Sequence, residues 1–412
     1  MKKGWKTVEI GQIAELRGRI GWKGLTAKEY TNGGPLFLSV HSLNYGDYVD
    51  YRDAFHISQE RYDESPEIML ARNDILICKD GAGIGKVGLV GEVTEPATIN
   101  SSLLLIRPSV HVIPKYLYFC LKSPYFQEIV QSRLEGATTP HLYQRDITTF
   151  PVVLPAMEEQ QTIAAILDEA FEGLDRARAH AEANLQNARE LFEASLRQLI
   201  SESSEHWPKR TLMEVCTDFG RGRSKHRPRN DPALYGGPIP FIQTGEVSEA
   251  DHFITEFRQT YSEIGLSQSK LWPSGTVCVA IVGATIGESG ILEFDACFPD
   301  SVIGMTVNCE EADPEYIEYL LQFFKAELKN AGKGSARDNI NIATFADRLF
   351  PIPDVETQRI IAGRLNQLSK ELRLVVSRYL SKLHDLDDLR QSLLHKAFEG
   401  ELTQISEPAY AA

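Results

Sequence analysis

The amino-acid sequence contains one long unit twice, at an offset of roughly 200 residues. Phe150-Pro151 reappears as Phe350-Pro351, and each copy is followed by similarly spaced Pro, Glu, Gln, Ile and Ala residues. Further pairs at about this offset are Trp5 and Trp207, Gly18 and Gly220, Arg19 and Arg221, Gly81-Ala82 and Gly283-Ala284, and Pro114 and Pro314. Two copies of one unit imply a molecule with internal pseudo-symmetry. Such a molecule suits a target that also comes in two parts.

Length and composition predict a multidomain cytoplasmic protein. A chain of 412 residues favours two to four domains. Its Lys-rich start is not followed by an apolar stretch, which argues against a signal peptide. The longest apolar runs, such as Thr276–Ile281, are far too short to span a bilayer, so we expect no membrane partner. The six cysteines form no Cys-x-x-Cys pair, which predicts reduced thiols rather than disulfides or a zinc site.

The distribution of charge is more informative than its sum. The net charge of −14 argues weakly against a nucleic-acid partner. The excess of acid, however, sits largely in residues 151–205, with 4 basic and 11 acidic residues, and in residues 206–350, with 14 and 20. Residues 1–150 are balanced, with 17 of each. Local clusters of basic residues are therefore a better indicator of nucleic-acid binding than the net charge.

Residues 1–150 and 206–350 read as two globular domains of mixed α/β type. Both contain short β-type runs separated by Gly, Pro and Asn turns. The expected strands are Asp74–Cys78, Leu103–Ile106, Thr276–Ile281 and Ile303–Val307. Each domain then has a helix that begins at a proline, where the missing N–H would be unpaired in any case.

Residues 157–201 and 355–399 predict two long helices. The second has apolar residues in steps of three and four over about five heptads, and the first has a thinner, alanine-richer seam. Gly400 is expected to end the second helix as its C′ residue. Because each helix follows an equivalent domain, we expect the two to pair as an antiparallel coiled coil. The alternative is that each helix lies on a globular core.

Two basic loops occupy equivalent places in the repeat. Flexible cationic loops can follow a phosphate backbone, where each neutralised phosphate releases counterions. In the first copy the cations are Arg17, Arg19, Lys23 and Lys28, and in the second they are Arg221, Arg223, Lys225, Arg227 and Arg229. A single such cluster is usually just a solvated loop. Recurrence in both copies favours contact with DNA.

Further candidates for DNA contact lie on turns. Residues 80–88 contain a formal G-x-G-x-x-G, but the repeat partner at 283–290 lacks it, and both stretches read as strand–turn–strand. The stretch does not match a P-loop either, because Val87 occupies the position at which a P-loop needs Ser or Thr to bind magnesium. Small, hydroxyl and cationic residues follow each domain helix. They suit contacts to phosphates or base edges, and an ordinary loop without a DNA contact is an equally good interpretation. The turn and loop candidates are Lys79, Lys86, Thr138, Arg145, Lys333 and Arg337.

No catalytic motif is convincing. Ser123-Pro124-Tyr125-Phe126 is one proline short of the loop of amino-methyltransferases, and its repeat partner retains nothing of it. We found no separated Asp and Asp/Glu-x-Lys nuclease set, no Gly-x-Ser-x-Gly and no His-Glu-x-x-His. The sequence therefore predicts a binding protein with no catalytic residues, no cofactor and no metal. An enzyme in its own right is the competing class.

The whole chain resembles the specificity subunits of Type I restriction–modification systems. The most telling match is the C-terminal run Leu389-Arg390-Gln391-Ser392-Leu393-Leu394-His395-Lys396-Ala397-Phe398-Glu399-Gly400-Glu401-Leu402, which looks like the family's L-x-x-S-I/L-L-x-x-A-F-x-G-x-L ending. The stretches after Phe150-Pro151 and Phe350-Pro351 look like its P-x-P-x-x-x-E-Q-x-x-I-A helix starts, although the second reads Asp354-Val355-Glu356-Thr357-Gln358. The first helix also lacks the Ala-Phe-x-Gly ending, as expected where the chain continues.

The resemblance implies a DNA reader with two target recognition domains, residues 1–150 and 206–350. It implies long spacer helices in residues 151–205 and 351–412, which fix the unread gap between the two half-sites. The implied partners are double-stranded DNA, two methyltransferase subunits and a restriction/translocase subunit. Two alternatives stay open: a related system whose partner fuses methylation and cleavage, and a coiled-coil scaffold with no DNA role.

Overall fold

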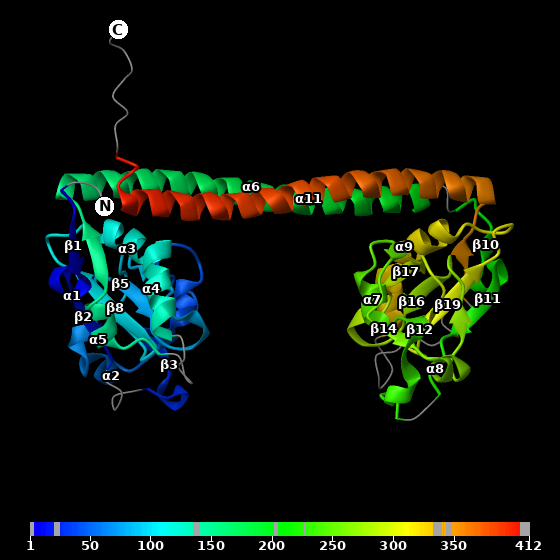
Figure 1. Cartoon of the computed structure of the whole chain (residues 1–412), viewed down its shortest axis with the longest axis horizontal. Helices are drawn as coiled ribbons and strands as arrows, with labels where there is room; N and C mark the ends of the chain where they lie inside the picture. The colour runs from blue at the N-terminus through cyan, green and yellow to red at the C-terminus, as the bar shows by residue number, and fades with distance from the viewer. Residues whose placement is uncertain are drawn as a thin grey trace, which may run out of the picture. The chain divides into compact units, whose positions relative to one another are not determined.

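The chain folds into two compact units, which are described separately. The computed structural model describes residues 4–19, 25–134, 141–201, 205–225, 228–332, 340, 342 and 348–403. The first unit comprises Met1–Glu182 with Leu380–Ala412, and the second comprises Ala183–Tyr379 (Figure 1). Each unit therefore holds one β-rich domain and parts of both long helices, α6 (Met157–Ser201) and α11 (Val355–Glu399).

The first unit is built on three sheets. A four-stranded sheet has the order β2-β8-β5-β6, a three-stranded sheet has the order β4-β3-β7, and β1 pairs with β9. The strands are β1 (Lys6–Glu9), β2 (Ala14–Gly18), β3 (Thr31–Leu38), β4 (Phe55–His56), β5 (Ile75–Cys78), β6 (Val87–Leu89), β7 (Ala97–Ile99), β8 (Leu103–Pro108) and β9 (Pro151–Leu154). The α-helices of this domain are α1 (Ile10–Ile13), α2 (Gln59–Asp63), α3 (Pro114–Lys122), α4 (Pro124–Leu134) and α5 (Gln144–Thr148).

The second unit repeats this plan. Its sheets have the orders β11-β19-β16-β17-β13 and β14-β12-β18-β15, and β10 pairs with β20. The strands are β10 (Lys209–Arg210), β11 (Cys216–Arg221), β12 (Tyr235–Phe241), β13 (Phe253–Ile254), β14 (Gln259–Tyr261), β15 (Leu271–Trp272), β16 (Val277–Ala280), β17 (Ser289–Leu292), β18 (Ala296–Cys297), β19 (Val302–Val307) and β20 (Phe350–Pro351). The domain helices are α7 (Thr244–Glu249), α8 (Glu263–Ser267) and α9 (Pro314–Gly332).

The two domains share the topology of their central strands, to which the second unit adds β13 and β15 at the sheet edges. β2, β8, β5 and β6 correspond to β11, β19, β16 and β17, with antiparallel pairing throughout both series. In the second sheet of each domain the pairs β3–β7 and β12–β18 are parallel. The four strands expected from the sequence, and the two proline-initiated helices, are confirmed. The internal repeat is therefore a repeat of fold as well as of sequence.

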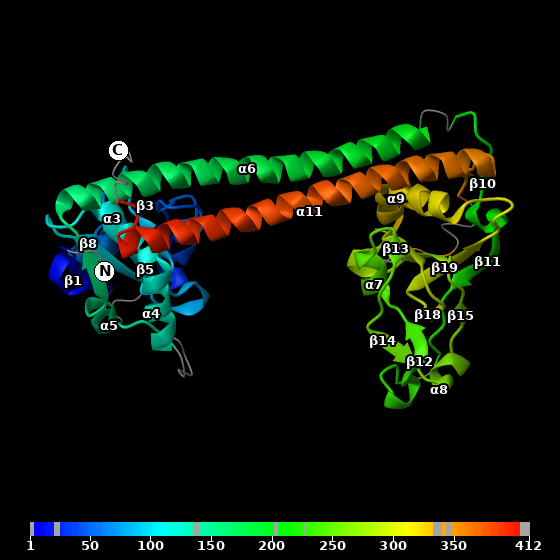
Figure 2. The same cartoon turned by 45° about the horizontal axis from the view of Figure 1, so that its top comes forward.

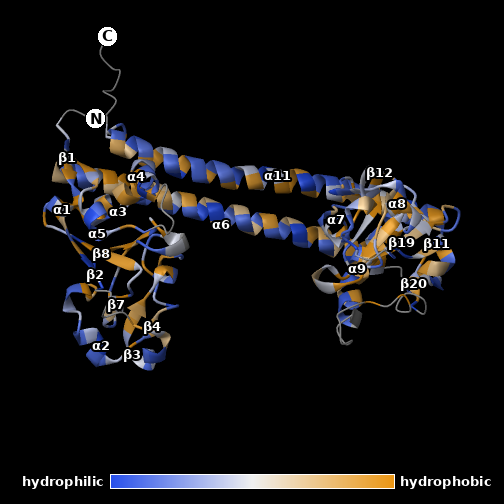
Figure 3. Cartoon of the chain, turned by 60° about the horizontal axis from the view of Figure 1, so that its bottom comes forward, coloured by the Kyte–Doolittle hydropathy of each residue, from blue (hydrophilic) through white to orange (hydrophobic). Residues whose placement is uncertain are grey.

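Alternation along the central strands separates two cores in each domain. Successive strand residues point to opposite faces of a sheet. Ile75 and Ile77 of β5 pack with the helices, whereas Leu76 and Cys78 pack with the three-stranded sheet. Strands β16 and β19 divide their residues in the same way in the second unit. Figure 3 shows hydrophobic residues gathered in the strands and scattered among hydrophilic ones along α6 and α11.

The long helices pack against each other and on the domain of each unit. In the first unit Leu167 and Phe171 of α6, and Leu394 and Ala397 of α11, lie in one buried core. Asp175 pairs with Arg390 and Arg178 pairs with Asp387, so residue numbers rise on one helix as they fall on the other. The helices are therefore antiparallel, as the sequence predicts, and they lie side by side in Figures 1 and 2.

Both long helices have the bounds that the sequence predicts. Each contains 45 residues, α6 from Met157 to Ser201 and α11 from Val355 to Glu399. Gly400 follows α11 with a φ of 84°, and the next N–H bonds back to the carbonyl of Lys396 at 2.9 Å. This left-handed residue confirms the expected C′ glycine.

A buried glutamine joins each domain to its long helix. Gln160 Oε1 accepts the N–H of Ile113 at 2.9 Å, and its Nε2 donates to the carbonyl of Pro155 at 2.9 Å. Gln358 makes the equivalent bonds with the N–H of Asp313 at 2.9 Å and the carbonyl of Pro353 at 2.7 Å. Both side chains are at most 1% exposed. The glutamines that mark the repeat in the sequence therefore attach the start of α3 or α9 to the helix that follows.

Replacing Gln160 by alanine will destabilise the first unit, and Gln358→Ala will destabilise the second. Each change leaves buried main-chain groups without partners, which costs about 1–3 kcal/mol. Urea unfolding of the full chain measures the loss. The exposed neighbour Gln161 supplies a control, since Gln161→Ala removes an amide of the same kind from the surface. Equal midpoints for Gln160→Ala and Gln161→Ala would contradict the prediction.

Candidate DNA interface

In the first unit several candidate residues meet at one end of the four-stranded sheet. Gly18 pairs with Leu104, and Cys78 pairs with Leu103. The end of β2, the start of β8 and the end of β5 therefore lie side by side. Arg17 and Lys79 are at this sheet end, and the segment that leads into α5 joins it through the N–H of Leu142, which donates to the carbonyl of Lys79 at 2.9 Å.

The second unit assembles the same sheet end from β11, β19 and β16. Arg221 pairs with Ile303, and Ala280 pairs with Val302. The N–H of Ile340 donates to the carbonyl of Ile281 at 2.9 Å, as Leu142 does to Lys79 in the first unit. The basic loop of residues 221–229 leaves the sheet at this end. Both copies thus place cations at the same position of the fold.

The basic loop contains two kinds of arginine. The guanidinium of Arg221 donates to the carbonyl of Ile340 at 3.2 Å, and Arg229 pairs with Asp300 at 2.9 Å. These two cations hold the loop to its neighbours. Arg223 and Lys225 are exposed, and the loop backbone is tied down around them. The Lys225 N–H donates to Gln268 at 2.6 Å, and the Arg223 carbonyl accepts from Ser269 at 2.8 Å.

Arg19 is buried, unlike the exposed Arg17. Its Nε donates to the carbonyl of Ile99 at 3.0 Å, and its guanidinium lies 5.4 Å from the centre of the Phe37 ring. Burial, reinforced by nearby Arg61, lowers the pKa of this guanidinium. Arg19 therefore ties β2 to the three-stranded sheet, a role that a count of basic residues does not distinguish from contact with phosphate.

The glycine-rich turn is a strand–turn–strand element, as the sequence predicts. β5 ends at Cys78, residues Gly81–Gly83 form a 3-10 turn, and β6 begins at Val87. Gly85 has a φ of 86°, and a side chain at this position would meet Gln127. No helix follows the turn directly, so a dinucleotide-binding arrangement is absent from this stretch. Lys86 is exposed and donates to Asn44 at 2.7 Å.

The remaining candidates fall into two groups. Arg145 is exposed on α5, which packs against β2. The others lie outside the described residues: Lys23, Thr138, Arg227, Lys333 and Arg337. Sequence reasoning missed three polar residues at the same sheet end, namely Asp80, His141 and Tyr143. The alternation His-x-Tyr-x-Arg over residues 141–145 is the signal that would have found two of them.

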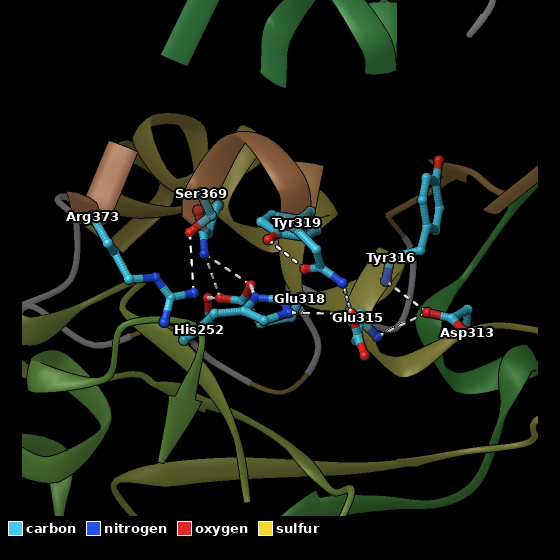
Figure 4. Close-up of polar contacts among 11 residues, drawn as sticks. His252, Asp313, Glu315, Tyr316, Glu318, Tyr319, Ser369 and Arg373 are labelled. Atoms are coloured by element: carbon cyan, nitrogen blue, oxygen red, sulfur yellow. Dashed lines mark hydrogen bonds and ion pairs between the residues drawn. The ribbon is translucent and has the colours of Figure 1, made fainter. Parts of the chain in front are cut away.

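Polar networks at the domain–helix junctions differ between the two units. In the second unit His252 Nδ1 lies 2.5 Å from Glu318 Oε2, and its Nε2 lies 3.8 Å from Glu315, with the Tyr319 ring stacked on the imidazole (Figure 4). Arg373 of α11 reaches Asp251 at 3.2 Å. The junction therefore combines a buried His252–Glu318 pair with an exposed ion pair to α11.

The equivalent junction of the first unit is centred on a carboxylate. Asp47 accepts from Lys122 at 2.5 Å and from the hydroxyl of Tyr118 at 2.9 Å, and Arg390 of α11 lies 3.8 Å away. Burial raises the pKa of Asp47, but the two cations and these hydrogen bonds outweigh it, so the pKa is lower than usual. These junctions connect the domain to the helix in each unit.

Neither a candidate metal site nor a candidate membrane span is present among the described residues. Within them no group of three or more His, Cys, Asp or Glu side chains could hold a metal ion. In the same part of the chain no helix is long and apolar enough to cross a bilayer.

A family model covers both halves of the repeat. The family described as Type I restriction modification DNA specificity domain matches residues 2–182 and again residues 204–376. The chain belongs to this family. The resemblance inferred from the repeat and the helix motifs is thereby confirmed. The chain is a DNA-recognition component of a Type I restriction–modification system.

Specificity subunits of other Type I restriction enzymes are similar to this chain along nearly its whole length. The StySPI specificity subunit of Salmonella potsdam is 21% identical, over 98% of this chain and 90% of the relative. The EcoKI specificity subunit of Escherichia coli K12 is 22% identical with the same coverage. The alignment therefore includes both domains and both long helices.

Solved structures share the fold. A chain from a structure described as "Structural basis underlying complex assembly and conformational transition of the type I R-M system" superposes with a TM-score of 0.77, at 17% identity, over 97% of this chain and 99% of that one. The HsdS subunit from Thermoanaerobacter tengcongensis gives a TM-score of 0.57 at 18% identity, covering 97% of each chain. Both solved chains therefore share the fold of this chain along nearly its whole length.

Proposed function

We propose that this chain reads a bipartite DNA site, with one target recognition domain for each half-site. The observation that carries the proposal is the recurrence of the same basic sheet end in both units. Arg17, Lys79 and Arg145 occupy it in the first unit, and Arg223 and Lys225 occupy it in the second. Exposed lysine and arginine side chains give phosphate contacts that position a protein on a duplex. Side chains between them are then placed to read base edges.

We further propose that the chain itself catalyses nothing and acts through partner subunits. The acidic first turn of α6, with Glu158 and Glu159, repels DNA and suits a protein surface instead. The partners would be two adenine methyltransferase subunits and, through them, a restriction/translocase subunit. A partner that fuses methylation and cleavage would use the same surfaces. In this proposal α6 and α11 act as the spacer between the half-sites.

The deciding experiment is a genome-wide map of N6-methyladenine in cells with and without this gene, with its partner methyltransferase present in both. The expected result is methylation of a two-part motif with a fixed gap, which disappears when the gene is deleted. Unchanged methylation, with the methyltransferase shown to be active, would remove the DNA-reading role and favour a coiled-coil scaffold.

A further inference from the structure

We propose that Arg145 reads a guanine in the half-site of the first domain, supported by Tyr143, His141 and Asp80. This inference rests on the proposed function and makes it specific at one base pair. It assigns base recognition to four side chains at the sheet end, each in contact with the next through a hydrogen bond, an edge-to-face ring contact or a cation–π contact, and this series is called the stack.

The stack begins at a carboxylate on the sheet. Asp80 Oδ1 is hydrogen-bonded to His141 Nδ1, and the two residues also form an isolated antiparallel bridge. The imidazole contacts the Tyr143 ring, with centroids 4.4 Å apart and planes at 65°. The Arg145 guanidinium lies over the other end of the stack, 4.8 Å from the centre of the Tyr143 ring. Four side chains thus support one another in sequence.

Hydrogen bonds to neighbouring segments fix the backbone segment that contains His141 and Tyr143. His141 forms a β-bridge with Asp80, and the backbone of Tyr143 is extended, so side chains alternate in direction along this short segment. Leu142 is buried, and its N–H donates to Lys79. The Gln144 amide donates to the carbonyl of Leu16 at 3.0 Å. Buried Leu142 and the amide of exposed Gln144 therefore hold the segment to Lys79 and to β2, and His141 and Tyr143 lie on the side opposite Leu142.

The exposed end of the stack has the chemistry of a base reader. The Arg145 side chain is 80% exposed, and Tyr143 is 51% exposed. Among the described carboxylates, the guanidinium contacts only that of Asp146, with Nε 3.7 Å from Oδ1. A guanidinium stacked on an aromatic ring keeps its donor edge free, and that fork matches the O6 and N7 acceptors of guanine.

Pre-organisation distinguishes this arginine from an ordinary phosphate contact. A free surface arginine loses rotamer entropy when it binds, whereas the Tyr143 ring already restricts the Arg145 side chain. Contact with a phosphate needs only a positive charge and tolerates a mobile side chain. A base edge needs the fork in a defined plane, and the anchored stack supplies that plane.

The stack is a property of the first domain alone. Main-chain hydrogen bonds align Lys79 with Ile281, because each donates to a serine, Ser102 or Ser301, at 2.9 and 3.0 Å. The residue after Lys79 is Asp80, whereas the residue after Ile281 is Val282. The second domain therefore has no carboxylate at the anchor position. A defect in the stack should change one half-site and leave the other as it was.

The test is the methylation motif of Arg145→Ala, mapped in cells that contain the intact gene set. We expect one G·C position in one half-site to become degenerate, with discrimination reduced roughly tenfold to a hundredfold. Arg145→Lys should fail in the same way, because lysine lacks the fork. Tyr143→Ala should weaken discrimination at the same position, since it removes the ring beneath the guanidinium.

Arg52→Ala is the matched control. Arg52 is also an exposed arginine of the first unit that lies over a tyrosine ring, 4.2 Å from the centre of Tyr45, but it is paired with Asp50. Its removal should leave the motif unchanged. A motif that stays intact in Arg145→Ala, whether methylation is uniformly weaker or unaltered, overturns the inference. If the wild-type chain itself directs no bipartite motif, the proposed function fails instead.

Discussion

Exchanging residues 1–154 for the equivalent stretch of another specificity subunit will replace one half of the methylated site and retain the other. The stretch ends after β9, so that β1 and its antiparallel partner move together. The physical reason is that each domain has its own pair of cores and its own basic sheet end. The measurement is an N6-methyladenine map of the chimera, compared with maps of both parents.

The exchange has an internal control in the second unit. Replacing residues 207–352, which include β10 and its partner β20, should change the half-site that the first chimera retains. Leu394, Ala397 and Phe398 of α11 form part of the first domain's core, so the donor must supply apolar residues that pack against them. A chimera that folds but alters both halves of the motif would contradict one domain per half-site.

Removing the two exposed cations of the basic loop, in the double variant Arg223→Ala and Lys225→Ala, will lower DNA affinity at every sequence. Each cation that neutralises a phosphate releases counterions, so the logarithmic salt dependence of binding should become shallower by about 2. Binding of the methyltransferase complex to duplex DNA at several salt concentrations measures this slope. The recognised motif should stay the same, because phosphate contacts position the protein and carry no sequence information.

The control removes the same charge from elsewhere on the second unit. Arg258 and Lys209 are exposed and lie outside the basic loop. Arg258 pairs with Glu249 at the end of α7, and Lys209 is in β10. The double variant Arg258→Ala and Lys209→Ala should leave the salt dependence close to that of the wild type. If both double variants change the slope equally, the effect comes from net charge and the loop has no special role.

The architecture could be predicted from the sequence because its determinants are local and repeated. Heptad spacing and the glycine at position 400 set the bounds of the long helices, and Pro114 and Pro314 set the starts of α3 and α9. The same motifs, with two matching units, supported the family resemblance. Antiparallel pairing followed from the order of domains and helices alone.

The candidate site was less predictable, because burial and pairing depend on residues far apart in the chain. Arg19 and Arg17 look alike in sequence, yet Arg19 is fixed by Ile99, 80 residues away. His252 and Glu318 are separated by 66 residues and meet only when β13 and α9 pack together. The stack at Asp80 and His141 spans 61 residues. Such contacts are set by tertiary structure, and a list of basic residues does not contain them.

The two buried glutamines bear on how fast these domains can diverge. Gln160 and Gln358 bond to main-chain N–H and carbonyl groups of their domains. The hydroxyls of Tyr116 and Tyr316 likewise donate to backbone carbonyls, of Val153 and Pro351. Main-chain groups are the same whatever the side chain, so substitutions accumulate across a domain while its attachment stays intact. Relatives only 21–22% identical can therefore align over 98% of the chain, and recognition loops can drift toward new sites on an unchanged frame.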